Sequence, residues 1–292
     1  MRLKGKTAII TGGSRGIGRA VAKAFLTEGA NVAIAARSGA ELRSTLLELK
    51  ELGAIIGTKT DVSDKDDVER LVSGTLAEYG SVDVLVNAAA VQSPMGLFIE
   101  TEADEWLKNI MINLLGTALC CRYVLPIMVE AKKRNKTRGK IINFSGGGAT
   151  SARPFFSAYA ASKAAVVRFT ETVSEEVREF GIDVNAVAPG EVNTGMLEEV
   201  INAGQRVGSE ESRKALERKL AGGVPPELAA ELVVFLSSGD SDGITGKLIS
   251  ARWDPYTDDD FTDALRNDRD IASLRRIDGR TFFKATVNHR HA

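Results

Sequence analysis

The chain of 292 residues has only two cysteines and two histidines. Cys120 and Cys121 are adjacent within an apolar stretch, and two neighbouring thiols cannot cross-link a chain of this size. We therefore expect reduced, buried thiols and no disulfide framework. Because His289 and His291 stand in the last few residues, no spacing of Cys and His suggests zinc, and the sequence predicts no metal site.

An excess of charge of one sign and long apolar runs are also missing. The 38 basic and 39 acidic residues nearly cancel, which gives no electrostatic reason to expect nucleic acid or an anionic membrane as a partner. Met1–Lys6 leads directly into the apolar segment Thr7–Thr11 without a secretory signal, and no apolar run approaches the ~20 residues that span a bilayer. We therefore expect a cytoplasmic protein with no membrane partner.

Short apolar, β-branched segments alternate with longer segments of helical periodicity. The predicted strands are Thr7–Thr11, Asn31–Arg37, Ala54–Asp61, Val82–Asn87, Lys140–Ser145 and Asp183–Ala188. The predicted helices are Ile17–Glu28, Ala40–Leu52, Lys65–Tyr79, Glu102–Lys133 and Ser157–Glu179. Parallel neighbours need crossover helices, and strands covered on both faces are almost continuously apolar. The sequence therefore predicts an α/β fold with a doubly wound parallel sheet, the Rossmann fold.

Neither an internal repeat nor a low-complexity linker divides the chain. We expect a single domain, residues 1–251, that carries both cofactor and substrate sites, followed by a C-terminal extension, residues 252–292. The extension is rich in Asp and Arg, and it is either an ordered arm or a frayed tail. Its aromatic residues favour the ordered arm because they seek burial: Trp253, Tyr256, Phe261, Phe282 and Phe283.

A glycine-rich loop, Thr11–Gly18, follows the first predicted strand and opens the first helix. Gly12 permits a tight turn, Gly16 lets the main chain approach a pyrophosphate, and Gly18 lets the helix pack closely on the strand. The helix N-terminus offers free N–H groups and a partial positive charge to the phosphates. The predicted dinucleotide contacts here are Gly12, Ser14, Arg15, Gly16, Ile17 and Gly18.

The end of the second strand distinguishes the two nicotinamide dinucleotides. A site for NAD(H) usually has an acidic residue there, which accepts from the ribose 2′-hydroxyl. This strand ends in Arg37 and Ser38, and Arg15 adds a second cation from the glycine loop. Two guanidinium groups suit a 2′-phosphate, so the sequence favours NADP(H) over NAD(H). The alternative is that both arginines are merely solvated.

Tyr159 and Lys163 are four residues apart near the start of a predicted helix and therefore share one face. A tyrosine with a pKa near 10 is a poor base at neutral pH, and a neighbouring ammonium favours its phenolate. Tyr159 could then exchange a proton with a substrate oxygen while a hydride moves to or from nicotinamide.

In order along the chain, these motifs resemble the short-chain dehydrogenase/reductase family, and within it the 3-oxoacyl-carrier-protein-reductase-like branch. The resemblance covers roughly Leu3 to Ser250 and implies an NAD(P)-dependent oxidoreductase acting on a carbonyl or a secondary alcohol. The residues that carry it are the Thr11–Gly18 loop, Asp61-Val62, Asn87–Ala90, Asn113, Tyr159 with Lys163, and Pro189-Gly190 followed by Thr194.

The resemblance also implies roles for single residues. Asn113 would hold a water that links Lys163 to solvent, and Lys163 would hold the hydroxyls of the nicotinamide ribose. The further cofactor contacts would be Asp61 and Val62 at the adenine, Asn87 at the adenosine ribose, and Val192 and Thr194 at the carboxamide. Ala88, Pro189 and Gly190 would also contact the cofactor.

Three departures from the family pattern stand out. Gly146 occupies the position of the substrate-orienting serine; Ser145, one residue earlier, either reaches the site or leaves that role empty. Ala90 replaces a glycine close to the cofactor. In the extension, Trp253 and Asp254 either contact substrate or only anchor the arm.

The substrate itself is open: a ketone, a sugar or polyol, and an acyl thioester all fit. Its pocket should be lined by Val91–Phe98, Gly146–Phe156 and Glu191–Gly208, the last being either a mobile helical lid or an ordinary surface helix. The apolar helices Glu102–Lys133 and Ser157–Glu179 predict a homo-oligomer, a dimer or a tetramer. Competing hypotheses are an epimerase or dehydratase that retains its nicotinamide cofactor, and a non-catalytic dinucleotide-binding or sensing homologue.

Overall fold

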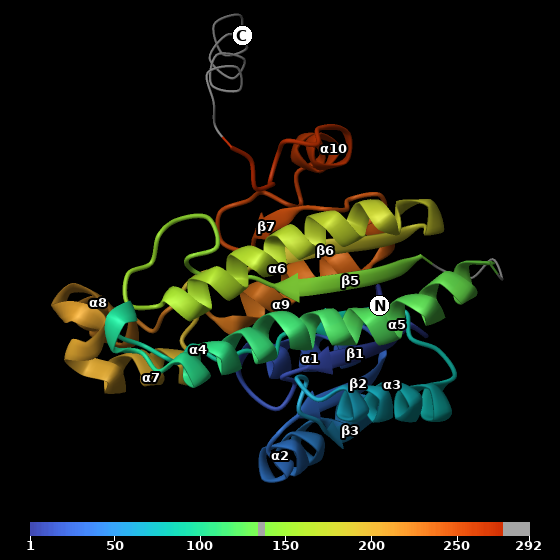
Figure 1. Ribbon diagram of the computed structural model, residues 1–292. Helices are drawn as coiled ribbons and strands as arrows, with labels where there is room; N and C mark the ends of the chain where they lie inside the picture. The colour runs from blue at the N-terminus through green and yellow to red at the C-terminus, as the bar shows by residue number, and fades with distance from the viewer. Residues whose placement is uncertain (134–137, 277–292) are drawn as a thin grey trace, which may run out of the picture.

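A computed structural model describes residues 1–133 and 138–276 (Figure 1). Its centre is a parallel sheet with the strand order β3-β2-β1-β4-β5-β6-β7, which confirms the predicted doubly wound fold. The strands are β1 Thr7–Thr11, β2 Asn31–Ala36, β3 Ile55–Lys59, β4 Val84–Asn87, β5 Gly139–Phe144, β6 Ile182–Ala188 and β7 Leu248–Ser250. The sequence predicted six of these strands; the short edge strand β7 was not among them.

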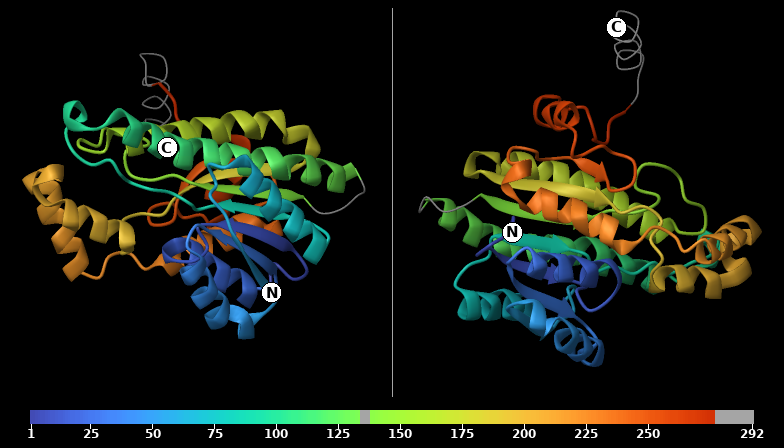
Figure 2. Two further views of the ribbon diagram at one scale, coloured as in Figure 1. Left: turned by 60° about the horizontal axis from the view of Figure 1, so that its bottom comes forward. Right: turned by 180° about the vertical axis from the view of Figure 1, so that it is seen from behind.

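Helices cover both faces of the sheet, as Figure 2 shows. The helices are α1 Gly16–Thr27, α2 Gly39–Leu49, α3 Lys65–Tyr79, α4 Ala103–Ile110, α5 Gly116–Lys133, α6 Ser157–Glu176, α7 Gly195–Ala203, α8 Gly208–Leu220, α9 Pro226–Ser237 and α10 Asp259–Asn267. Apolar side chains of α1, α2 and α9 pack on one face of the sheet, and those of α3, α5 and α6 pack on the other. The central strands are therefore buried on both sides, which explains their continuous apolar sequences.

The predicted helix Glu102–Lys133 is interrupted. Between α4 and α5, Met111–Leu115 forms a π-helical segment, η3, and such segments often lie at functional sites. By length and composition alone, Ala103–Lys133 could cross a membrane, although core helices of soluble proteins pass the same test. The sequence analysis therefore underestimated the length of this apolar run, and 39% of its most apolar window is buried.

The described part of the extension, 252–276, folds back onto β7 and α6. Leu248 N in β7 donates to Ala272 O (2.7 Å), and the buried Lys247 Nζ donates to Asp268 O (2.5 Å) and Ile271 O (2.9 Å). In Figure 1, α10 lies above β7 and α6, away from α7 and α8. The extension thus covers the free edge of the sheet.

The extension does not use its tryptophan for packing. Trp253 is 73% exposed, which contradicts the expectation that it is buried. Tyr256 packs against Phe235 of α9 (ring centroids 5.5 Å apart), and Phe261 joins the core below. Asp254 accepts from Ser250 N (2.7 Å) and so closes a local turn. Phe282, Phe283, His289 and His291 lie outside the described residues.

Candidate functional site

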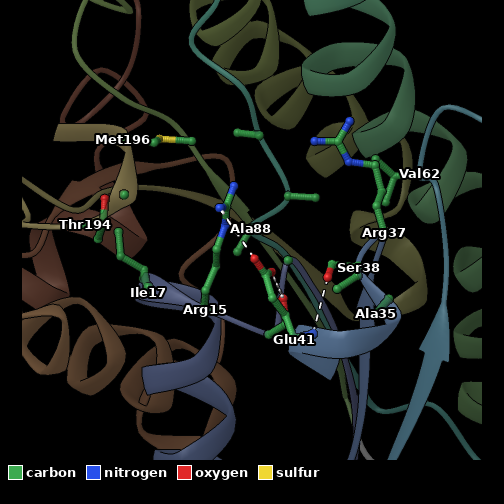
Figure 3. Close-up of a pocket in the computed structure, with 18 of the residues that line it drawn as sticks. Arg15, Ile17, Ala35, Arg37, Ser38, Glu41, Val62, Ala88, Thr194 and Met196 are labelled. Atoms are coloured by element: carbon green, nitrogen blue, oxygen red, sulfur yellow. Dashed lines mark hydrogen bonds and ion pairs between the residues drawn. The ribbon is translucent and has the colours of Figure 1, made fainter. Parts of the chain in front are cut away.

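A cavity of about 570 Å³ opens at the carboxyl ends of the strands, where β1 and β4 are neighbours and the strand order reverses (Figure 3). Such switch points are where open α/β sheets bind ligands. The residues that line it come from the loops after β1 to β4, from η3 and from the start of α7: Gly12, Ser14, Arg15, Gly16, Ile17, Gly18, Ala35, Ala36, Arg37, Ser38, Glu41, Thr60, Val62, Ala88, Ala89, Ala90, Ile112, Thr194, Gly195 and Met196.

The glycines of the loop are required by close backbone approaches. A Cβ on Gly12, whose φ is +66°, would stand 2.9 Å from the main chain of Ala88. A Cβ on Gly18 would overlap the carbonyl oxygen of Gly12. The close approach of Gly18 to Gly12 lets α1 begin directly beside the loop, and the cavity opens over these glycines. The residues therefore fit a dinucleotide pyrophosphate, which needs main-chain N–H groups at a helix N-terminus.

Arg15 and Arg37 both border the cavity, as the sequence predicted. In Figure 3 Arg37 extends beside Val62, whereas Arg15 reaches across the opening toward Glu41. Sequence analysis missed Glu41. Its carboxylate accepts from Ser14 Oγ (3.2 Å) and lies 3.9 Å from Arg15 Nη1. The acidic group that is absent at the end of β2 thus enters the cavity from the first turn of α2.

Two further predicted cofactor residues lie beside the cavity, not in its lining. Asp61 accepts from both the backbone and the hydroxyl of Ser63; burial raises its pKa, but these bonds and the charge on Arg37 outweigh burial and lower it. The Asn87 side chain is buried, and its Nδ2 donates to Asn143 Oδ1 (2.9 Å). After β4, Ala88, Ala89 and Ala90 line the cavity instead.

The loop after β6 carries the last group of predicted cofactor residues. Pro189 and Gly190 form its start, and Val192 makes an isolated parallel bridge with Val224. Thr194, the N-cap residue of α7, lines the cavity, and its Cγ2 would stand 3.3 Å from a Cβ on Gly16. The loop thus brings α7 against the glycine loop.

Tyr159 and Lys163 both lie on the buried face of α6, as predicted from their spacing. Lys163 Nζ donates to Phe144 O (2.8 Å) and lies 5.8 Å from the centre of the Tyr159 ring. Burial lowers the pKa of Lys163 to about 8. Burial raises the pKa of Tyr159, and the charge that opposes this effect comes from Arg153, 5.7 Å from the ring centre.

The three glycines after Ser145 make room for other side chains. A Cβ on Gly146 would overlap the Tyr159 hydroxyl, and a Cβ on Gly148 would stand 2.6 Å from Ala160 Cβ. Ser145 is buried, and its hydroxyl has no hydrogen-bond partner within the described residues. The Ser145 hydroxyl is therefore free to donate to a substrate, whereas the space next to Gly146 is filled by the Tyr159 hydroxyl.

Asn113 lies in η3, and both the oxygen and the nitrogen of its side-chain amide are engaged in hydrogen bonds. Its Oδ1 accepts from Val91 N (2.9 Å), and the two protons of its Nδ2 are shared among three acceptors: Val91 O (2.9 Å), Asn109 Oδ1 (2.9 Å) and Ser162 Oγ (3.0 Å). The side chain therefore ties the loop after β4 to α6. The main-chain carbonyl of Asn113 accepts from Thr117 Oγ1, and a relay water at this residue stays a prediction.

Apolar side chains from the three segments expected to line the substrate pocket meet around Tyr159: Met95, Phe155, Phe156, Leu197 and Val200. Arg153 adds a cation here, with its guanidinium 3.8 Å above the Phe156 ring and its Nη2 3.3 Å from Glu211 Oε1 of α8. The segment α7–α8 therefore covers Tyr159, as a lid would.

Comparisons with known proteins agree with this geometry. The short chain dehydrogenase family profile matches residues 6–204. A short chain dehydrogenase of Pseudocercospora fijiensis is 40% identical over 80% of this chain and 76% of its own length. The 3-oxoacyl-(acyl-carrier-protein) reductase of Thermotoga maritima is 35% identical over 85% of this chain and 97% of its own length.

Solved structures agree as well. Levodione reductase matches with a TM-score of 0.77 and 28% identity over 85% of this chain and 96% of its own. An actinorhodin polyketide ketoreductase with NADPH matches with a TM-score of 0.77 and 32% identity over 84% and 95%. The chain therefore belongs to the short-chain dehydrogenase/reductase family and is an oxidoreductase that interconverts carbonyl and alcohol groups.

Proposed function

We propose that the chain works with NADP(H) and uses Tyr159 as the general acid and base toward a carbonyl or secondary alcohol. The observation that carries this proposal is the position of the glycine-lined cavity. Its far wall, at Ile112 and Met196, belongs to η3 and α7, and these elements contact α6 and Tyr159. Cofactor and substrate oxygen can therefore meet at one place.

The dinucleotide would be held mainly by main-chain groups. Arg15 takes the N-cap position of α1 without a side-chain cap, within the described residues, so the N–H groups of the first turn are available to phosphates. When bound, the nicotinamide supplies or accepts the hydride. Along the dinucleotide, we assign Val62 and Asp61 to the adenine and Asn87 and Ala88 to the adenosine ribose. We assign Pro189, Gly190, Val192 and Thr194 to the carboxamide of the nicotinamide.

Tyr159 would give its hydroxyl proton to the substrate oxygen in reduction and take it back in oxidation. Because burial raises its pKa, the phenol is protonated at neutral pH and ready to act as an acid. Lys163 Nζ donates one of its three N–H groups to Phe144 O, and the other two can donate to ribose hydroxyls. The unpaired hydroxyl of Ser145 is the candidate to orient the substrate carbonyl.

The preference for NADP(H) rests on Arg15 and Arg37, which border the cavity where a 2′-phosphate would lie. Fluorescence titration with NADPH and NADH, followed by reduction of a mixed carbonyl panel, tests the proposal. Tighter NADPH binding with turnover of a panel member is the expected result. Replacing Arg37 by Asp should shift the preference toward NADH; an unchanged preference would assign the phosphate to another group.

Gly146 favours a second candidate, a non-catalytic dinucleotide-binding or sensing protein, because the family serine is missing there. This candidate predicts tight cofactor binding without turnover of any carbonyl. The buried Tyr159–Lys163 pair favours the enzyme.

We also propose a cytoplasmic homo-oligomer in which residues 1–251 form the domain and 252–292 an extension. Large apolar side chains stay exposed in α4 and in the 3-10 turn before it, including Leu107 (55%) and Ile99 (88%). A second copy that covers them would remove this apolar surface from water. Light scattering after size-exclusion chromatography measures the state; a monomer would contradict the proposal.

A further inference from the structure

Glu41 is the acidic group that pairs with Arg15, one of the two arginines that border the cavity. Its Oε2 accepts from Ser14 Oγ (3.2 Å), and its Oε1 lies 3.9 Å from Arg15 Nη1. Figure 3 shows the carboxylate pointing into the opening, between Arg15 and Ser38. It thus occupies two of the groups, Ser14 and Arg15, that a phosphate at this place would need.

The orientation of this side chain is not explained by helix capping. Ser38 is the N-cap of α2 and accepts from Glu41 N (3.3 Å), which is half of a capping box. In the other half, the glutamate side chain turns back to the N-cap residue. Here it turns away, toward Ser14 and Arg15 of the glycine loop.

Charge makes the two dinucleotides respond differently to this arrangement. A 2′-phosphate beside Glu41 meets a like charge and competes with it for Arg15. A 2′-hydroxyl meets an acceptor instead and can donate to the carboxylate. Because the Glu41 side chain is only 45% exposed, its charge is not fully screened by solvent.

We propose that Glu41 sets the cofactor selectivity of the cavity: it weakens binding of NADP(H) and supports binding of NAD(H). The inference rests on the proposed function, because it assumes that the cavity holds a nicotinamide dinucleotide. The two arginines would then give a moderate preference for NADP(H), and the chain would accept both dinucleotides.

The test is a fluorescence titration of the full chain with NADPH and NADH, before and after Glu41→Gln. We expect the Kd of NADPH to fall by about three- to tenfold, because a repulsive charge is removed and Arg15 is released. The Kd of NADH should rise by about two- to fivefold, because a neutral acceptor replaces a charged one.

Glu48→Gln is the matched control. Glu48 also lies on α2 and is 48% exposed, and it pairs with Arg19 of α1 (3.2 Å) as Glu41 pairs with Arg15. It is not among the described residues that line the cavity. Both Kd values should therefore stay unchanged. In an Arg15→Gln background, Glu41→Gln should improve NADPH binding less, because part of its effect is the release of Arg15.

If the ratio of the two Kd values is unchanged in Glu41→Gln, either because neither value changes or because both change equally, the inference is overturned and the proposed function still stands. If neither dinucleotide binds the unaltered chain, the proposed function itself fails. Thermal unfolding of each variant shows whether its fold is retained; we expect no shift, since the Ser38 cap uses the backbone of Glu41.

Discussion

The hydroxyl of Tyr159 lies in the space that a side chain on Gly146 would fill. A Cβ at that position would overlap the hydroxyl oxygen and stand 3.1 Å from Cζ and 3.3 Å from Cε1 of the ring. Gly146 is not among the described glycines with positive φ, so its backbone would tolerate a side chain. A side chain at this position would instead have to displace the Tyr159 hydroxyl. The family serine is therefore replaced by the tyrosine itself, not by an empty position.

The first prediction is that Gly146→Ser impairs the enzyme, although it restores the family residue. The added Cβ and hydroxyl must displace Tyr159, and overpacking of this kind costs about 1–3 kcal/mol. We expect kcat/KM to fall by about 10- to 100-fold, with an unchanged Kd for NADPH. Steady-state kinetics and the fluorescence titration measure both quantities.

Gly147→Ala is the control for this variant. A Cβ on Gly147 would stand 3.6 Å from Arg153 Nη1, an ordinary contact, and this glycine also has no positive φ within the described chain. We expect its kcat/KM to stay within about twofold, as for a substitution without steric conflict. A Gly146→Ser enzyme that is faster than the original would show that Tyr159 yields and that the serine is useful.

The second prediction concerns the proton. Tyr159→Phe removes only the hydroxyl, and Phe fits the same apolar surroundings on α6. Turnover should fall by about 10²–10⁴-fold, the range expected for loss of a general acid. The Kd of NADPH should stay nearly unchanged. Persistent turnover in the Phe variant would assign proton transfer to another group.

The fold was largely predictable because its signals are local. Each buried strand is an apolar run, and each crossover helix has a clear period. The glycine loop was equally predictable, because close backbone approaches, such as that of Gly18 to the Gly12 carbonyl, exclude every residue with a Cβ atom. Sequence therefore located the cavity through its backbone requirements.

Side-chain directions were not predictable in the same way. Ser38 caps α2 through the backbone N–H of Glu41, whereas the Glu41 carboxylate turns to Ser14, which is distant in sequence. The π segment Met111–Leu115 has no sequence signal at all. Trp253 was expected to anchor the extension, but Tyr256, Phe261 and Leu265 do so instead. All three outcomes depend on tertiary contacts.

The third prediction is that Arg153→Gln moves the titration of Tyr159 to higher pH. Burial raises the pKa of Tyr159, and the Arg153 charge opposes that effect, so its removal raises the pKa further. Oxidation of an alcohol needs the phenolate, and its rate should therefore require a higher pH. Reduction uses the protonated phenol and should be retained to a higher pH. Rates in both directions against pH, and tyrosinate absorbance of the free protein, measure the shift.

Arg218→Gln separates this charge effect from a structural one. Arg218 shares Glu211 Oε1 with Arg153, at 3.4 and 3.3 Å, but its Nη2 also pairs with Glu191 (2.7 Å). Lys163 also lies near the Tyr159 ring, 5.8 Å from its centre, and Glu198 of α7 pairs with Lys219 of α8 (2.9 Å). If both arginine variants shift the pH profile equally, Arg153 acts only by tying α8 through Glu211.

The fourth prediction is that deletion of residues 252–292 destabilises the domain. It removes the acceptor of the Leu248 backbone N–H and both acceptors of Lys247 Nζ. It also removes Leu265, which is buried, and thereby exposes the apolar surface of the domain against which Leu265 packs. Each lost bond to a charged group is worth about 1.5–3 kcal/mol. We expect Tm to fall by about 5–15 °C for a domain of this size.

The same deletion uncovers β7, an edge strand with a free row of donors and acceptors. The shortened chain should therefore self-associate at concentrations at which the full chain is stable, which dynamic light scattering detects. Trp253→Ala is the control, because its side chain is 73% exposed and its loss should shift Tm by less than about 1 °C. A shortened chain with unchanged Tm and size would mean that β7 needs no cover. In that case the contacts at Lys247 would hold the extension to the domain without stabilising the sheet.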